Sequence, residues 1–133
     1  MQGSSEEAPL AREVVRVAPG AVDLSAKLDL MALGGFISLC TAFVANDSGP
    51  MHMARGLGVP TLALFGSTDP GMFDFQGHRA LFAQGIPCAP CSFYGRSRCP
   101  KGHFQCMLEL GANTVWDALV PLLAGGRRPL VSA

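Results

Sequence analysis

The chain has 133 residues, 49% of them hydrophobic and only 15% charged, with ten acidic and ten basic side chains. This length favours a single domain, and the balanced charge gives no global field that would draw the protein to nucleic acid or acidic membranes. No apolar run reaches the roughly 18 residues of a membrane span and residues 1–7 do not resemble a signal peptide, so we predict a cytoplasmic protein with reduced cysteines.

The amino-terminal part is expected to be only partly ordered. Residues 1–13 are predicted to be a loose segment, and the valine-rich residues 14–18 form either a short strand or the end of a helix that begins near Leu10. Pro19 and Gly20 end this element. Apolar residues then recur at helical spacing, which predicts a helix over about 28–40.

A strand, a polar turn and a helix start follow one another over residues 42–57. Residues 42–46 predict a buried strand, and Pro50 stands where a first helical residue belongs, because its missing N–H would be unpaired there anyway. The helix is predicted over about 50–57, with Gly58 as its end. A second strand is predicted over 60–65, and small polar residues again follow it at 66–69.

The two turns suggest an anion site. If the strands are parallel, both turns lie at the carboxyl edge of one sheet, where open α/β sheets bind ligands. A helix N-terminus there presents N–H groups and a partial positive charge, which suit phosphate. The alternative is that Ser48, Thr68 and Asp69 serve only as helix caps.

The rest of the chain is less regular. Residues 71–102 are predicted to be mostly loop, followed by a last helix capped by Asn113 or Thr114 and running to about Leu123, and by a tail at 125–133. We expect Phe104 and Trp116 to pack in the core. The fold class is therefore α/β, a Rossmann-like parallel sheet with flanking helices.

A Cys-rich loop, residues 86–107, contains four of the five cysteines and His103. Structural zinc is one interpretation, because the first pair has the spacing of a zinc knuckle; reduced packing cysteines and disulfides formed on oxidation are the others. The candidate metal ligands are Cys88, Cys91, Cys99 and Cys106. Arg96, Arg98 and Lys101 in the same loop form a small basic group, which either is solvated or contacts phosphates or acidic sugars of a ligand or membrane headgroups.

Residues 46–52 (NDSGPMH) and 58–70 (GVPTLALFGSTDP) closely resemble glycosyltransferase family 9, the ADP-heptose:lipopolysaccharide heptosyltransferases. The cysteine pattern is similar to that of family members resembling heptosyltransferase II. The resemblance implies that residues 14–124 are part of the carboxyl-terminal, donor-binding domain of a GT-B enzyme, with the Cys-rich loop inside it. GT-B enzymes have two Rossmann-like domains with the active site between them.

The resemblance also implies roles for the turn residues. The positions carried over to donor binding are Asp47, Ser48, Gly49, His52, Thr68 and Asp69. Asp47 would accept hydrogen bonds from the donor's sugar, Ser48 and the Gly49 N–H would hold phosphate, and His52 would support the turn. Thr68 and Asp69 would shape the pocket. The reaction would be inverting transfer of heptose from ADP-heptose to the lipopolysaccharide core, with no required metal cofactor.

The family's amino-terminal domain, with the acceptor site and general base, has no counterpart in these residues. We therefore expect no catalytic residue in this chain and no turnover by the chain alone. The implied partners are the nucleotide-sugar donor, the lipopolysaccharide core through the missing domain, peripheral contact with the inner membrane, and a second copy paired through an open strand edge. The rival hypothesis is a zinc-binding nucleic-acid or interaction module built on Cys88–Cys106, against which the neutral charge argues.

Overall fold

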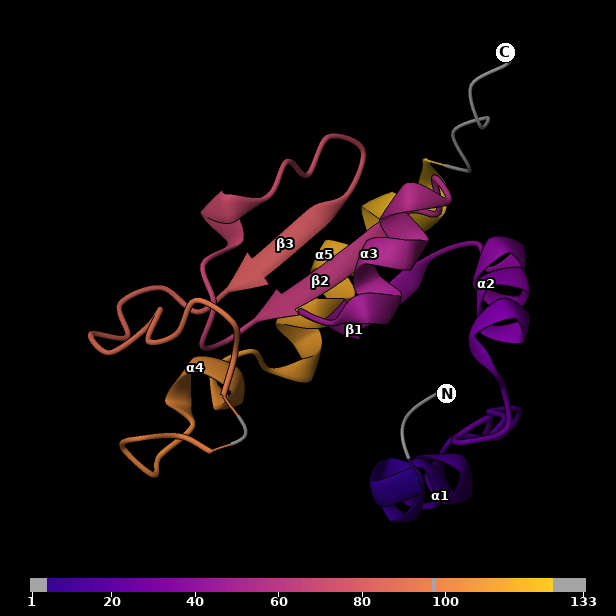
Figure 1. The fold of residues 1–133 in the computed structure, drawn as a ribbon, viewed down its shortest axis with the longest axis horizontal. Coiled ribbons are helices and arrows are strands. Elements are labelled where there is room, and N and C mark those ends of the chain that lie inside the picture. The colour runs from indigo at the N-terminus through magenta and orange to yellow at the C-terminus, as the bar shows by residue number, and fades with distance from the viewer. Residues whose placement is uncertain (1–4, 97, 126–133) are drawn as a thin grey trace. The chain divides into compact units, whose positions relative to one another are not determined.

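The computed structural model describes residues 5–96 and 98–125. The chain divides into two compact units, Met1–Phe36 and Ile37–Ala133, and the boundary falls inside the helix α2 (Leu30–Leu39). The predicted helix over 28–40 is thus confirmed to within two residues at its start and one at its end. Every strand of the sheet lies in the second unit (Figure 1).

The amino-terminal segment is helical where loose chain was predicted. A 3₁₀ turn, η1 (Ser5–Glu7), leads into α1 (Ala8–Val17), which has Pro9 in its first turn. Helix-favouring Ala, Leu, Arg and Glu dominate residues 8–13 and carry the helix through the valines that follow. The prediction of loose residues 1–13 is therefore wrong for residues 5–13, and the alternative of a helix ending near residue 18 is confirmed; residues 1–4 lie outside the described residues.

The second unit contains a three-stranded parallel sheet in the order β1 (Phe43–Asn46), β2 (Thr61–Phe65) and β3 (Arg79–Phe82). Ala45 of β1 is in register with Ala63 of β2, which is in register with Ala80 of β3. The first two strands and their parallel pairing confirm the α/β prediction. All three strands end at the same edge of the sheet, which is where the polar turns begin.

The helix α3 (Gly49–Gly56) connects β1 to β2 and begins and ends as its sequence indicates. At its carboxyl end Gly58 adopts a φ of 68°, in the left-handed region that glycine tolerates best. The Gly58 N–H donates to Arg55 O and the Val59 N–H to Ala54 O, both at 3.0 Å, which is the hydrogen-bond pattern of a Schellman motif. This ending turns the chain directly into β2.

The third strand, β3, lies in the segment predicted to be loop. Its four residues, RALF, include no β-branched residue and follow a segment, PGMFDFQGH, without a regular hydrophobic period, so the local sequence gives little strand signal. Pairing with β2 supplies hydrogen bonds to its backbone, and Phe82 packs against the core. Tertiary pairing thus decides this strand.

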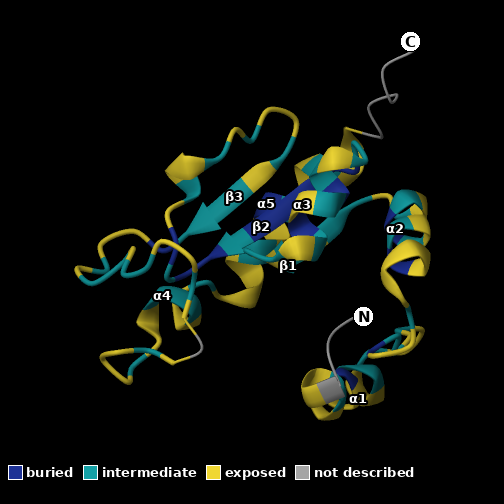
Figure 2. Cartoon of the chain, in the orientation of Figure 1, coloured by how far each residue is buried: buried dark blue, intermediate teal, exposed yellow. Residues whose placement is uncertain are grey.

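The core of the second unit is centred on β2. Phe65, Met51 of α3 and Ala63 are all fully buried, with Phe73 and Phe75 packed against them. The Phe65 ring contacts the Phe75 ring edge to face, with a centroid distance of 5.7 Å. Figure 2 shows the buried positions concentrated along β2 and in α3. This core supports the strand end from which the second turn leaves.

The last helix, α5 (Ala112–Ala124), packs on β2 and β3, with α3 in front of the sheet in Figure 1 and α5 behind it. Its N-cap is Gly111, so the predicted caps at Asn113 and Thr114 are wrong, and Pro121 does not shorten the helix. Trp116 is 58% exposed and Phe104 is 45% exposed, so the prediction that both pack in the core is wrong. Of the predicted tail 125–133, only Gly125 is described.

Candidate functional site

The two polar turns lie side by side, as predicted. Asn46, the last residue of β1, is in register with Leu64 of β2, and the Asp47 N–H extends the ladder by donating to Leu64 O at 3.3 Å. In the register of the sheet, the turn after β1 therefore begins one position before the turn after β2. Parallel pairing places both at the carboxyl edge of the sheet.

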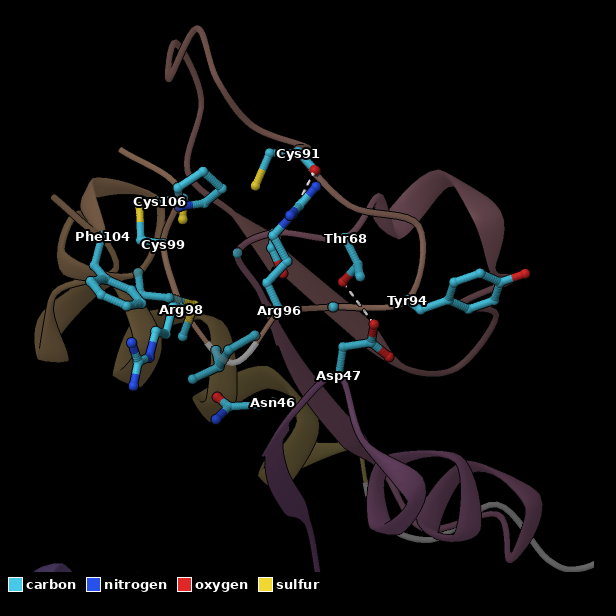
Figure 3. Close-up of a pocket in the computed structure, with 16 residues that line it drawn as sticks. Asn46, Asp47, Thr68, Cys91, Tyr94, Arg96, Arg98, Cys99, Phe104 and Cys106 are labelled. Atoms are coloured by element: carbon cyan, nitrogen blue, oxygen red, sulfur yellow. Dashed lines mark hydrogen bonds between the residues drawn. The ribbon is translucent and has the colours of Figure 1, made fainter. Parts of the chain in front are cut away.

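A hydrogen bond joins the two turns through their side chains. The Thr68 hydroxyl donates to Oδ2 of Asp47 at 2.7 Å, and Thr68 is only 3% exposed (Figure 3). The other carboxylate oxygen, Oδ1, lies 3.6 Å from Nε2 of His52 in the first turn of α3. The Phe73 ring stands against the His52 imidazole at 5.0 Å. The Asp47 carboxylate is thus held on one oxygen by a hydrogen bond, and the His52 ring lies near the other.

The start of α3 differs from a side-chain-capped helix. Ser48 is the N-cap residue with an extended backbone, but its hydroxyl donates to Asn46 O at 3.0 Å and makes no cap hydrogen bond. A Cβ added to Gly49 would meet nothing within 4 Å, so the first helical residue faces open space. The start of α3 therefore keeps room for a ligand, and the capping interpretation does not describe Ser48.

Asp69 has the capping role that was the alternative to ligand binding. Its carboxylate accepts a hydrogen bond of 2.8 Å from the Gly71 N–H and so caps η2 (Pro70–Met72). Thr68, the residue before it, turns instead toward Asp47. Two adjacent polar residues therefore do different things: one joins the two turns and the other shapes the second turn.

A pocket of about 500 Å³ opens at this edge of the sheet. Of the six residues predicted to bind the donor, it is lined by Asp47 and Thr68; it is not lined by Ser48, Gly49, His52 or Asp69. The opposite wall comes from the Cys-rich loop and α4 (Gln105–Leu108), through residues that include Tyr94, Arg96, Arg98, Phe104 and Met107. The sequence had marked Arg96 and Arg98 as a basic group but gave no sign that they share a pocket with Asp47.

Three of the loop's cysteines, Cys91, Cys99 and Cys106, also line the pocket, and Cys88 Sγ lies 3.5 Å from His103 Nε2. Within the described residues, no group of three or more His, Cys, Asp or Glu side chains is arranged to hold a metal ion. Structural zinc therefore remains a prediction without support from the side-chain geometry, to be decided by metal analysis of the purified protein.

The cysteines of the pocket differ in acidity. The pKa of Cys99 is lowered, chiefly because the Phe104 N–H donates a hydrogen bond to the Cys99 sulfur. The pKa of Cys106 is raised, first by burial and then by the negative charge of the neighbouring thiolates of Cys91, Cys99 and Cys88. Cys99 therefore holds the larger thiolate fraction near pH 8. Since the thiolate is the reactive form, Cys99 should also be the more reactive of the two.

We expect iodoacetamide to alkylate Cys99 faster than Cys106 in the folded protein, at pH 8 and with a chelator present. Peptide mass spectrometry of a time course measures the two rates, and the difference should shrink as the pH rises past both pKa values. The urea-unfolded chain is the control, in which both rates should become similar. Equal rates in the folded state would contradict the assigned acidities.

Comparison with known proteins gives one family. The sequence model of glycosyltransferase family 9 (heptosyltransferase) matches residues 1–98. The chain is 33% identical over 103 residues to lipooligosaccharide heptosyltransferase 2 of Campylobacter jejuni, covering 76% of this chain and 31% of that protein. It is 39% identical over 66 residues to lipopolysaccharide heptosyltransferase 1 of Pseudomonas aeruginosa, covering 49% of this chain and 19% of that protein.

A solved structure shares the fold. The crystal structure of the glycosyl transferase family 9 from Veillonella parvula aligns with a TM-score of 0.68 at 22% identity, over 93% of this chain and 36% of that one. The matches thus span between about a fifth and about a third of the length of these relatives. Among the described helices, none combines the length and the apolar character that crossing a membrane requires.

Proposed function

This chain belongs to glycosyltransferase family 9, and on that premise we propose that it forms the part of a heptosyltransferase that binds the nucleotide-sugar donor. The reaction of the whole enzyme is inverting transfer of a heptose from ADP-heptose to the lipopolysaccharide core. The proposal follows the names of the relatives, which are lipopolysaccharide and lipooligosaccharide heptosyltransferases. The alternative of a zinc-binding nucleic-acid module has no support from these relatives.

The observation that carries the proposal is the Asp47–Thr68 hydrogen bond at the floor of the pocket. With its carboxylate oriented by Thr68, Asp47 can accept hydrogen bonds from sugar hydroxyls without first reorganising. The open start of α3, at Ser48 and Gly49, would receive the diphosphate, where backbone N–H groups and the helix dipole favour negative charge. Asp69 contributes by shaping the neighbouring turn.

In the reaction, negative charge grows on the diphosphate as the bond to the sugar breaks. N–H donors that are already in place stabilise this charge at no cost of reorganisation. We propose that the acceptor and the general base come from outside these residues. The chain alone should therefore release no ADP from ADP-heptose in a coupled assay with a lipopolysaccharide acceptor. A cytoplasmic location at the inner membrane and a homodimer remain predictions.

Isothermal titration calorimetry of the purified chain with ADP-heptose, and with ADP as a competitor, tests the proposal. We expect both ligands to bind, and ADP to displace ADP-heptose. A chain that is folded by circular dichroism but binds neither ligand would overturn the proposed function.

We predict that Gly49→Ala weakens ADP binding by about tenfold, the effect of losing one hydrogen bond to a charged group. The added methyl stands in the open space that the phosphate would occupy, while the fold has room for it. Thermal unfolding should show unchanged or slightly higher stability, because alanine favours the helix over glycine.

The matched control for this variant is Gly56→Ala, in the last turn of the same helix, where an added Cβ also meets nothing within 4 Å. It should gain similar stability and bind ADP like the wild type. If Gly49→Ala also binds ADP like the wild type, the start of α3 is not the phosphate site.

A further inference from the structure

The Cys-rich loop is anchored to the sheet edge where it faces the pocket. The N–H groups of Cys91 and Ser92 both donate to the carbonyl oxygen of Ser67, at 2.9 and 2.8 Å, and Ser67 belongs to the turn after β2. The loop then closes on itself, since the Ser92 hydroxyl donates to Gly95 O at 2.8 Å and accepts from the Tyr94 N–H at 3.3 Å. The residue that follows, Arg96, therefore leaves the backbone from a fixed point beside the second turn.

The Arg96 side chain turns back into the pocket. Its Nε donates to Cys91 O at 3.2 Å, and Figure 3 shows the guanidinium directed toward Cys91, to one side of the pair formed by Thr68 and Asp47. Among the described residues, no carboxylate forms an ion pair with it. A guanidinium has five N–H donors in a planar fork. The contact with Cys91 uses the one on Nε, so the N–H groups on the two Nη atoms can still donate to phosphate oxygens.

The charges of the pocket lining also favour an anion on this side. The lining contains two guanidinium groups, those of Arg96 and Arg98, and one carboxylate, that of Asp47. Thr68 already donates a hydrogen bond to that carboxylate. In Figure 3 the Arg98 side chain lies beside Phe104, whereas Arg96 is drawn on the side of Thr68 and Asp47.

We propose that Arg96 is a specificity-determining residue that binds the diphosphate of the donor from the side of the Cys-rich loop, opposite the start of α3. The inference rests on the proposed function and adds a cationic contact from a segment outside the two turns. A nucleotide sugar would then place its sugar at Asp47 and its diphosphate at Arg96, reaching toward the start of α3, whose Ser48 and Gly49 follow Asp47 in the chain outside the pocket lining. Recognition of two linked phosphates, rather than one, would depend on this side chain.

Calorimetry of the full chain with ADP and with AMP tests the inference. We expect Arg96→Ala to weaken ADP binding by about tenfold and AMP binding by less than about threefold, because only ADP presents the second phosphate. Arg96→Lys should give an intermediate loss for ADP, since lysine keeps the charge without the planar fork. Circular dichroism checks that both variants fold.

The matched control is Lys101→Ala, an exposed cation of the same loop that does not line the pocket. It should bind ADP like the wild type, which separates a local contact from loss of net charge. Wild-type affinity for ADP in Arg96→Ala, or an equal loss for ADP and AMP, would overturn the inference while the proposed function stands. If the wild-type chain does not bind ADP, the proposed function fails, and the inference fails with it.

Discussion

Replacing Phe65 with alanine is expected to lower the free energy of unfolding by about 3–5 kcal/mol, the usual cost of removing a buried aromatic ring. Phe65 is fully buried at the end of β2, and its ring contacts those of Phe73 and Phe75 with centroid distances of 6.0 and 5.7 Å. The cavity left behind would lie directly under the turn that carries Thr68. Urea unfolding followed by circular dichroism measures the loss.

Two further variants give this prediction its controls. Phe65→Leu keeps most of the buried volume and should cost about 1–2 kcal/mol, less than alanine does. Phe93→Ala removes the same side chain from a position that is 67% exposed and should change stability by no more than about 0.5 kcal/mol. A loss below about 1 kcal/mol for Phe65→Ala would mean that the core of the second unit is not centred on this ring.

Asp47→Ala should weaken ADP-heptose binding by about 10- to 150-fold, the range for losing one hydrogen bond to a charged group. ADP, which lacks the sugar, should lose less. The same change leaves the Thr68 hydroxyl, which is 3% exposed, without its acceptor, at a cost of about 1–3 kcal/mol in stability. Calorimetry with both ligands, together with thermal unfolding, separates the two effects.

Asp47→Asn distinguishes the carboxylate's charge from its hydrogen bond to Thr68. The amide oxygen can still accept from the Thr68 hydroxyl, so stability should stay close to that of the wild type, while affinity for the sugar falls. Asp74→Ala is the control for lost charge, because Asp74 is exposed and does not line the pocket. Unchanged ADP-heptose affinity in Asp47→Ala would remove Asp47 from the donor site.

Local signals account for the elements that the sequence predicted well. β1, α3 and β2 each have a marker that acts through the neighbouring backbone: an apolar run, Pro50 at the helix start, or Gly58 at its end. Short connections then favour neighbouring parallel strands, and so place the two turns together. The Asp47–Thr68 pair was within reach of this reasoning because both residues directly follow their strands.

The errors occur where the decisive interaction is distant in sequence or where local signals conflict. The residues of β3 have little strand propensity, and they form a strand because the backbone of β2 pairs with them. In α1, helix-favouring neighbours outweigh a valine-rich end. Asn113 and Thr114 were plausible caps, but the helix begins before them, at Ala112. Phe104, expected in the core, instead lines the pocket.

The amino-acid sequence by itself determined the α/β class, the paired turns and the residues at their tips, because strand periodicity, Pro50 and Gly58 act over a few neighbouring residues. Only the tertiary structure decided which distant segment completes the pocket: Arg96 faces it from a loop about 50 residues along the chain from Asp47. The physical reason is that the position of Arg96 depends on how the Cys-rich loop is tied to Ser67. Such backbone hydrogen bonds between distant segments leave no pattern in the order of residues.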